Sequence, residues 1–285
     1  MSAYRVRGIV YYASIVVVLA AVLTRSFAPG TVVASALGAG IIPALSLVAL
    51  AILLTFLGPR YLSEGPTLTV SSPVHGLWEA LNSPATSVPS HGVRAWGQAY
   101  AIDLVHRPVG GSGARFGDGA YLAPEAFDGF GQSVHAMIDG EVVRATGRHR
   151  DHRSRTSAAA VLLMLLEGAV REMGGPSFIL GNHVSIRGAD GTVAVVAHLA
   201  RGSLRVKVGD RVRAGQVIGA CGNSGNSSEP HVHAQLMDRI SPWIAVGVPM
   251  AFADIEMSGD GKEPSGRHDM LPATGRNNER ATRLR

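Results

Sequence analysis

Two long stretches near the start of the chain contain no charged residue. The first runs from Gly8 to Thr24 and the second from Thr31 to Leu57. A helix needs about 20 apolar residues to cross the hydrocarbon core of a bilayer. The second stretch is comfortably long enough and the first is just long enough, so we predict a membrane anchor over residues 1–60 that folds as a two-helix transmembrane hairpin.

The few basic residues around the two apolar stretches give only a weak indication of how this hairpin is oriented in the membrane. Arg5 and Arg7 precede the first apolar stretch, and Arg25 is the basic residue between the two stretches. The positive-inside rule therefore weakly favours a cytoplasmic N-terminus, which would return the rest of the chain to the cytoplasm.

Beyond the hairpin the pattern changes to short alternating runs. Residues 61–90 are rich in Pro and Ser and are predicted to be a linker that becomes ordered near LWEALNSP. Residues 91–257 contain runs such as AYAIDLV, NHVSIRG and TVAVVAHL, separated by glycines. This pattern predicts an all-β domain of antiparallel sheets, arranged as a sandwich or barrel. The polar tail over 258–285 is predicted to be disordered.

One segment inside the β region has a different pattern. Ser157 to Arg171 consists of helix-forming residues and is apolar on nearly every face. It is too short to cross a bilayer, so we expect a helix that is buried or covers a groove, with contact at a membrane surface as the alternative.

Composition narrows the classes of function. The net charge is +5, but no nucleic-acid-binding motif accompanies it, so we expect no nucleic-acid partner. The single cysteine, Cys221, excludes an intrachain disulfide and is predicted to be a small packed residue.

The stretch EPHVHAQLMD places His231 and His233 one residue apart in an apolar run. In a strand, side chains two residues apart project from the same face. The two rings could therefore share a metal ion, or one could bind metal while the other transfers a proton. The third reading is a surface strand with two incidental histidines.

Other candidate ligands lie elsewhere in the β region. Asp103 occurs in the apolar run AYAIDLV, where a charge is costly unless it is paired with an arginine or bound to metal. His91 lies twelve residues upstream, and His198 ends another alternating run. The helical zinc motif HExxH is absent from the sequence, so a zinc site would have to be built from strands.

Together these motifs resemble the lysostaphin/LytM-type zinc metallopeptidases, a family of peptidoglycan endopeptidases with a duplicated-hybrid-motif domain. His91 with Asp103 is similar to the family's first ligand pair. The runs GQSVHAMIDGEVVRA, GNHVSI and AHL resemble its successive strands, and VKVGDRVRAGQVIGACGNSGNSSEPHVH resembles its glycine-rich segment ending in H-x-H.

The resemblance implies a role for each residue. His91, Asp103 and His233 would bind Zn²⁺, while His198 and His231 would handle protons and the developing oxyanion. Zinc-bound water would then attack peptide bonds of bacterial peptidoglycan. The expected partners are a peptidoglycan peptide, the lipid bilayer through the hairpin, and an activating protein. The substrate places the catalytic domain outside the cytoplasm, at the cell membrane.

The sequence also departs from the family pattern. About three dozen residues, approximately 146–178, stand where the family has a short turn, and this insertion contains the predicted helix. The spacing from His91 to Asp103 exceeds that of the commonest form. His135 and His183 have no role in the family and are expected to be partly exposed strand residues.

The sequence also suggests two alternative functions. VKVGDRVRAGQVIG also resembles biotinyl and lipoyl carrier hairpins, but its lysine, Lys207, is not at a tight turn. The stronger rival is a catalytically inactive relative that binds wall peptides or activates a cell-wall amidase. Such relatives typically lose zinc ligands, whereas all five expected residues are present in this chain.

Overall fold

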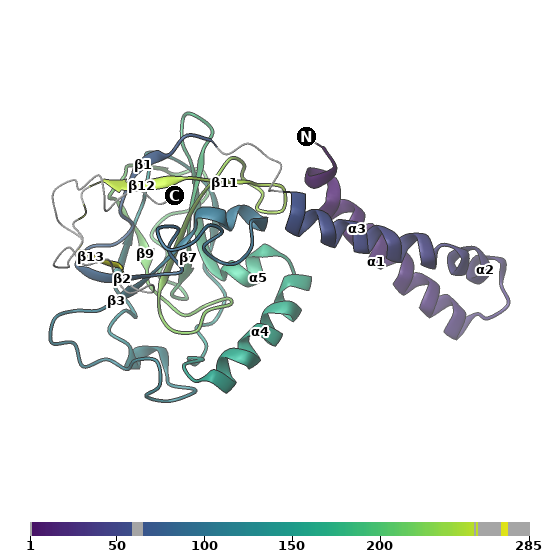
Figure 1. The fold of residues 1–285 in the computed structure, drawn as a ribbon, viewed down its shortest axis with the longest axis horizontal. Coiled ribbons are helices and arrows are strands. Elements are labelled where there is room, and N and C mark those ends of the chain that lie inside the picture. The colour runs from purple at the N-terminus through teal and green to yellow at the C-terminus, as the bar shows by residue number, and fades with distance from the viewer. Residues whose placement is uncertain (1, 59–64, 254, 256–268, 273–285) are drawn as a thin grey trace.

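A computed structural model describes residues 2–58, 65–253, 255 and 269–272, as a helical arm that extends from a body of β-strands (Figure 1). Two helices of the arm lie side by side, and two further helices lie against the body. The helices are α1 (Ser2–Phe27), α2 (Val32–Ala39), α3 (Ile41–Leu57), α4 (Ala158–Met173) and α5 (Pro176–Leu180).

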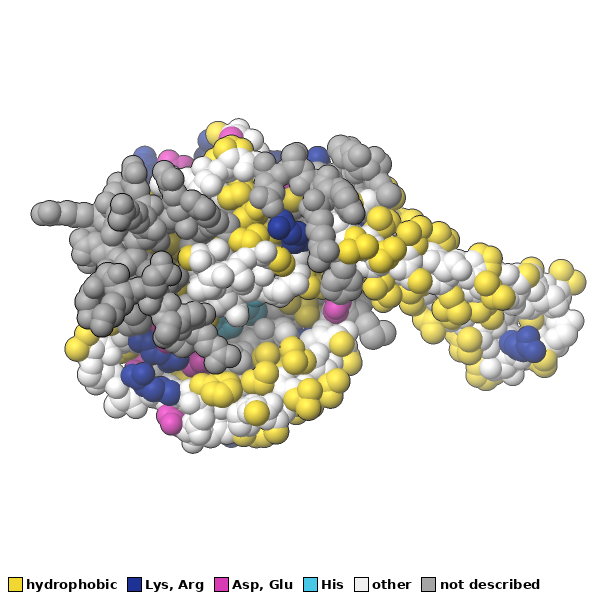
Figure 2. All heavy atoms as spheres, viewed as in Figure 1, with side chains coloured by type: hydrophobic (Ala, Val, Ile, Leu, Met, Phe, Trp, Pro, Cys, Tyr) yellow, Lys and Arg dark blue, Asp and Glu magenta, His cyan; other side chains and the backbone are white. Residues whose placement is uncertain are grey.

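The arm has the length and surface of a membrane hairpin. Val6–Phe27 and Val32–Thr55 are each long and apolar enough to cross a membrane. Hydrophobic side chains cover the visible face of the arm (Figure 2), and Ile9 and Ile42 are about three-quarters exposed. The prediction of two apolar N-terminal helices that pair as a hairpin is confirmed.

The body contains thirteen strands in the described part of the chain. They are β1 (Leu68–Ser71), β2 (Leu77–Leu81), β3 (Ile102–His106), β4 (Ser133–His135), β5 (Gly140–Thr146), β6 (Asn182–Arg187), β7 (Val193–Leu199), β8 (Arg211–Val212), β9 (Val217–Ala220), β10 (Val232–Met237), β11 (Gly247–Val248), β12 (Met250–Ala253) and β13 (Asp269–Pro272). The main sheet has the order β13-β2-β3-β10-β7-β6-β5-β8, with β11 also on β10. Its pairs are antiparallel, as predicted for an all-β domain.

Strands β10 and β7 form the centre of this sheet. Every residue of both strands is buried, and β7 is rich in valine, which favours extended backbone. Two small sheets, β1 with β12 and β4 with β9, cover one side of the main sheet and complete the hydrophobic core. The rigid centre of the molecule is therefore the strand that carries His233.

The predicted linker over 61–90 contributes more structure than expected. β1 pairs with β12, and β2 pairs with β3 in the main sheet. In β2, Trp78 and Ala80 face the core while their neighbours are half-buried. The surrounding prolines obscured this alternation in the sequence. Of the tail predicted to be disordered, only β13 belongs to the described residues, and it pairs with β2.

The predicted inserted helix is present as α4, between β5 and β6. Ser157 caps its N-terminus by accepting a hydrogen bond from the backbone N–H of Ala160. The expectation that His135 and His183 are partly exposed is wrong, because both are less than a tenth exposed. They face inward from β4 and β6, between packed neighbours.

Candidate active site

Strand β10 brings His233 and Asp103 together through its pairing with β3. His233 lies directly opposite Asp103 in the antiparallel register, so both side chains project from the same face of the sheet. His233 Nδ1 is 2.9 Å from Asp103 Oδ1. His231, two residues earlier, projects from the same face, and its Nε2 lies 3.5 Å from that oxygen. The same-face arrangement expected for the two histidines is present.

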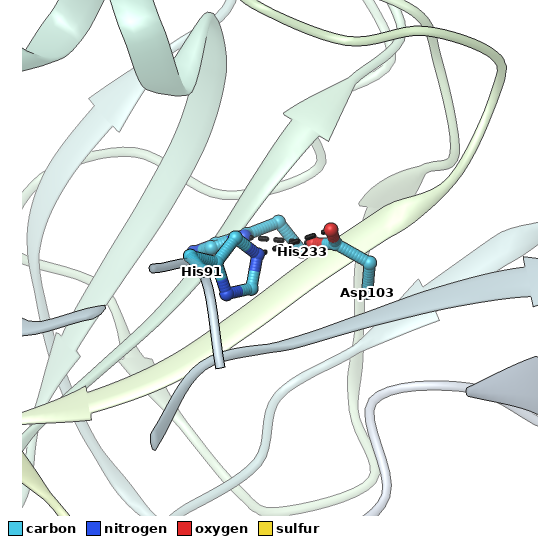
Figure 3. A group of neighbouring side chains, drawn as sticks. All are labelled: His91, Asp103 and His233. Atoms are coloured by element: carbon cyan, nitrogen blue, oxygen red, sulfur yellow. Dashed lines mark hydrogen bonds and ion pairs between the residues drawn. The ribbon is translucent and has the colours of Figure 1, made fainter. Parts of the chain in front are cut away.

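His91 reaches the site from the segment that follows β2. Its Nε2 lies 3.0 Å from Asp103 Oδ2, and the Asn82 side-chain amide donates to the same oxygen at 2.8 Å. Asp103 therefore contacts two neighbouring imidazoles that come from different parts of the chain, His91 and His233 (Figure 3). One nitrogen from each ring and one carboxylate oxygen lie within 4.8 Å of one another.

His198 enters the site from an irregularity in β7. Between the pairs Leu199–Asn182 and Val196–Val184, β7 has one residue more than β6. His198 itself has φ of +61°, which is unusual for a residue other than glycine. This bulge turns its ring toward His231, with ring centroids 4.6 Å apart.

Hydrogen bonds fix which nitrogen of each candidate ligand carries a proton. The Gln235 amide group donates to the Trp96 carbonyl at 3.0 Å, so its Oε1 is the atom that faces His233 Nε2 at 2.8 Å. The Ser90 hydroxyl donates its one hydrogen to the Ala101 carbonyl. In its contact with His91 Nδ1 it must therefore be the acceptor, so that His91 Nδ1 carries the proton. The remaining ring nitrogens, His233 Nδ1 and His91 Nε2, therefore turn their lone pairs toward Asp103.

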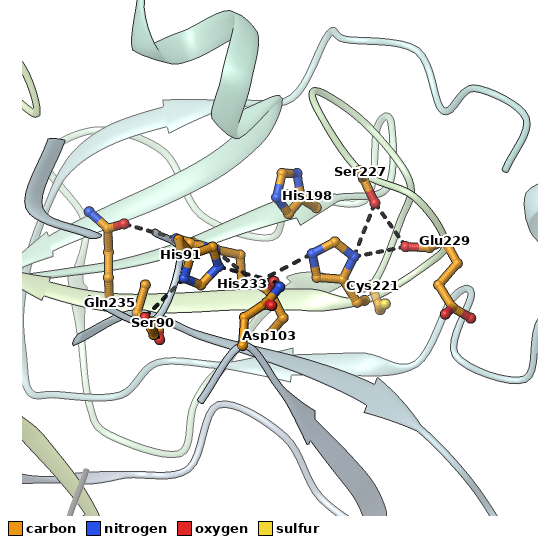
Figure 4. A network of polar contacts seen from close by, with 12 residues as sticks. Ser90, His91, Asp103, His198, Cys221, Ser227, Glu229, His233 and Gln235 are labelled. Atoms are coloured by element: carbon orange, nitrogen blue, oxygen red, sulfur yellow. Dashed lines mark hydrogen bonds and ion pairs between the residues drawn. The ribbon is translucent and has the colours of Figure 1, made fainter. Parts of the chain in front are cut away.

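The other two histidines are held by backbone carbonyls (Figure 4). His231 Nδ1 donates to the Glu229 carbonyl at 2.8 Å, with Ser227 Oγ 3.0 Å away. His198 Nδ1 donates to the Ser224 carbonyl at 2.8 Å. Each ring is therefore fixed by its Nδ1–H. Nε2 of His198 has no hydrogen-bond partner among the described residues, whereas Nε2 of His231 faces Asp103.

Burial and neighbouring charges both shift the pKa values of the residues in this site. Burial raises the pKa of Asp103, but attraction to His91 and His231 and a hydrogen bond from His231 outweigh it, so that pKa lies well below its usual value. Burial lowers the pKa of His198 strongly, and the neighbouring His231 lowers it further. Burial also lowers the pKa of His231, but Asp103 reverses the effect and raises it. The carboxylate is thus ionised under ordinary conditions.

The five residues line one cleft of about 580 Å³. Figure 2 shows histidine side chains at the bottom of a hollow in the molecular surface. Along one wall, α4 contributes Met164, Leu165, Gly168 and Ala169, so the insertion shapes access to the site. This wall is largely apolar, although Leu165 is 59% exposed.

The donor set suits a zinc ion. Two lone-pair nitrogens and a carboxylate oxygen are donors that Zn²⁺ accepts, and three protein ligands leave a fourth position open. Two ring lone pairs beside a carboxylate also require positive charge among them, supplied by a proton or a metal ion. His91, Asp103 and His233 therefore form a group that could hold zinc.

The five residues predicted from the sequence lie together in one cleft, but the sequence did not point to the residues that orient them. Gln235 continues the same-face row of His231 and His233, and the strand alternation could have revealed it. Ser90, Asn82 and the Ser224 carbonyl gave no such signal, because their contacts join loops that are distant in the sequence. Cys221 is buried and free, and burial raises the pKa of its thiol, as expected for a packed residue that is not a nucleophile.

Comparison with known proteins gives relatives for part of the chain. Over 87 residues the chain is 40% identical to glycyl-glycine endopeptidase ALE-1 of Staphylococcus capitis. This aligned region covers 30% of this chain and 24% of that protein. Over 109 residues it is 30% identical to the cell division protein DipM of Caulobacter vibrioides, covering 38% and 17%. The chain thus matches a quarter or less of the length of these relatives.

The catalytic domain of lysostaphin from Staphylococcus simulans aligns with 67% of this chain and 91% of that domain, at 19% identity and a TM-score of 0.31. The model of peptidase family M23 matches residues 125–243, which include His198, His231 and His233 but neither His91 nor Asp103. The sequence matches show that residues 125–243 of the chain belong to a peptidase family M23 domain that is homologous to the lysostaphin/LytM-type glycyl-glycine endopeptidases.

Proposed function

We propose that this protein is a membrane-anchored zinc metalloendopeptidase that hydrolyses peptide bonds in bacterial peptidoglycan. The observation that carries the proposal is the convergence of His91, Asp103 and His233 beside His198 and His231 at the bottom of one cleft. This constellation lies on a domain homologous to endopeptidases.

In this proposal His91 Nε2, Asp103 and His233 Nδ1 hold the metal. Zinc would supply a Lewis acid that polarises a carbonyl and makes water a usable nucleophile near neutral pH. Ser90 and Gln235 keep the two rings in the ligating tautomer, and Asn82 holds the carboxylate in place. Such orienting partners reduce the reorganisation that metal binding requires.

His198 and His231 act on the substrate. His198 Nε2 has no hydrogen-bond partner among the described residues, His231 Nε2 lies 3.5 Å from Asp103 Oδ1, and both rings line the cleft. One ring accepts a proton from the attacking water, and a ring that carries its proton donates to the developing oxyanion or to the leaving amine. Because backbone carbonyls fix the rings, this proton transfer needs no large movement of side chains.

The substrate class follows from the relatives. ALE-1 is named as a glycyl-glycine endopeptidase, and its similarity to this chain supports a peptide of the bacterial cell wall as substrate. The cleft has a volume of about 580 Å³, and α4 stands along one of its walls where the family has a short turn. We infer that the insertion narrows the range of peptides that can enter.

The apolar arm supports anchoring in the cell membrane, with the catalytic domain on the wall side. This orientation follows from the location of peptidoglycan and opposes the weak charge bias of Arg5, Arg7 and Arg25. An activating protein remains an expected partner, because a wall hydrolase at the membrane requires control.

A non-catalytic role is the second candidate, and the match to DipM, which is named for cell division, is the observation that favours it. In that role the domain would bind wall peptides or activate an amidase. The presence of all five site residues in one cleft favours the enzyme.

Digestion of purified peptidoglycan separates the two candidates. The zinc-loaded full-length chain should release fragments with new amino termini that mass spectrometry can assign to one bond. An amidase activator would release nothing alone and would speed release by an added amidase. Binding to wall without new termini under either condition would contradict both the enzyme and the activator.

A further inference from the structure

A second cavity lies away from the catalytic histidines, where the helical arm meets the β body. It has a volume of about 260 Å³, which is far more than a single water molecule needs. Tyr4 and Tyr12 of α1 reach the body, through a hydrogen bond of 3.3 Å to the Ala245 carbonyl and an edge-to-face contact with Trp243. The cavity therefore belongs to the junction at which the chain would leave the membrane. Its polar and aromatic lining includes Arg7, Tyr11, Tyr12, Trp96, Glu172 and Trp243.

Arg7 supplies the positive charge of this cavity, and one of its hydrogen-bond donors has no partner among the described residues. The Arg7 side chain is buried, with 3% of it exposed. Its Nε donates a hydrogen bond to Thr55 Oγ1 at 3.1 Å, and its Nη1 donates one to the Tyr4 carbonyl at 2.6 Å. Its Nη2 is buried and has no hydrogen-bond partner among the described residues. A buried guanidinium with an unused donor favours an anionic oxygen nearby, and phosphate is the group that guanidinium binds best.

The anion of this cavity lies on a different element. Glu172 occupies the last turn of α4 and lines the cavity without an ion pair to Arg7. Burial raises the pKa of its carboxyl. The aromatic rings around the cavity can also attract a cation. One cavity thus offers one place for a negative group and another for a positive group.

An apolar groove continues from this cavity along α1. It has a volume of about 630 Å³ and shares Gly8, Tyr12 and Trp243 with the cavity. Its other wall is the loop that contains Ser241 and Ile244. A ligand that fills both spaces would have a zwitterionic end and an apolar chain.

We propose that the junction binds a phospholipid with an amine-bearing zwitterionic headgroup, such as phosphatidylethanolamine. The phosphate accepts from Arg7, the ammonium group donates to Glu172, and an acyl chain lies in the groove along α1. The proposal rests on the membrane anchoring proposed above. Because Trp96, Ala169 and Glu172 also line the catalytic cleft, a bound headgroup would lie beside the entrance for substrate.

Native mass spectrometry of the detergent-purified full chain tests this site. Phosphatidylethanolamine, phosphatidylglycerol and phosphatidylcholine with identical acyl chains are added separately, and glycerophosphoethanolamine serves as the soluble headgroup. Phosphatidylethanolamine should bind about tenfold more tightly than the other two lipids, because it alone offers Glu172 a positively charged N–H donor. The soluble headgroup should bind more weakly than the lipid, since it leaves the groove empty. Stronger binding of the soluble headgroup would overturn the lipid assignment.

Two variants separate the contacts. Glu172→Gln should lower the affinity for phosphatidylethanolamine to that for phosphatidylglycerol. Arg7→Gln should weaken the binding of all three lipids about tenfold. Arg25 is an exposed arginine at the far end of the arm, so Arg25→Gln should leave the binding of all three unchanged. Equal binding of the three lipids, or an unchanged preference in Glu172→Gln, would overturn the proposal. Membrane fractionation and wall digestion are measured separately, so a failure of anchoring or catalysis is distinguishable from a failure of this site.

Discussion

At the scale of single residues, each of the four imidazoles is held through one ring nitrogen by a contact that fixes its orientation. Gln235 and Ser90 hold the candidate ligand rings, while the carbonyls of Glu229 and Ser224 hold the other two. This division predicts that the two pairs of histidines respond differently to substitution.

Removing His231 should separate metal binding from catalysis. We expect His231→Ala to keep its zinc, because Asp103 and His233 are unchanged, and to lose wall hydrolysis by about 10²–10⁴-fold. His135→Ala provides a matched control, since His135 is also a buried strand histidine and lies outside the site. Zinc content and release of new amino termini are measured on each variant. Normal turnover in His231→Ala would refute the role given to this residue.

Gln235 should affect metal affinity without touching the metal. In Gln235→Ala the His233 ring loses the acceptor that fixes its tautomer, so we expect zinc affinity to fall about 10–100-fold. Competition with a chelating dye measures this change, and the exposed Gln132→Ala is the control. An unchanged affinity would show that the tautomer of His233 is set by something else.

At the scale of elements, the sheet positions the site through backbone contacts that a sequence pattern cannot display. Alternation predicted the strands and the shared face of His231 and His233, and apolar composition predicted α4. The bulge that turns His198 inward depends on an extra residue in β7 relative to β6. No local pattern signals such a mismatch, because it arises from the register between two strands.

Gly181 tests this dependence on backbone approach. It has φ of +62°, and a Cβ atom there would lie 2.5 Å from the Ser224 carbonyl carbon, in the residue whose carbonyl oxygen holds His198. Gly181→Ala should therefore lower both stability and turnover. In Gly191→Ala the backbone also has a positive φ, but no atom lies within 4 Å, so it should lose roughly 1–2 kcal/mol of stability and keep its turnover per folded molecule. Thermal unfolding and wall digestion are the measurements. Equal turnover in the two variants would contradict the proposed coupling.

At the scale of the whole molecule, the apolar arm and the β body join at the cavity that contains Arg7 and Glu172. The sequence predicted both parts from hydrophobic runs and from strand alternation. It did not predict their contact, because the packing of Tyr12 against Trp243 joins residues more than two hundred positions apart. Order was predicted near LWEALNSP, which contains β2, but β1 was not predicted in this segment rich in proline.

The orientation of the body can be tested with an added cysteine. The native Cys221 is fully buried, whereas Val208 on the catalytic domain is 60% exposed. We expect Val208→Cys to react with a membrane-impermeant maleimide on intact cells, while the unmodified chain stays unlabelled. Labelling that requires cell lysis would place the domain in the cytoplasm and remove access to the wall.

The most direct test of the central claim is the zinc content of the full-length protein and of Asp103→Ala, measured by elemental analysis after removal of loosely bound metal. Asp103 lies between His91 and His233, so its loss should abolish tight binding. We predict about one zinc per chain in the unmodified protein and almost none in the variant. Equal zinc content in the two proteins would contradict the account.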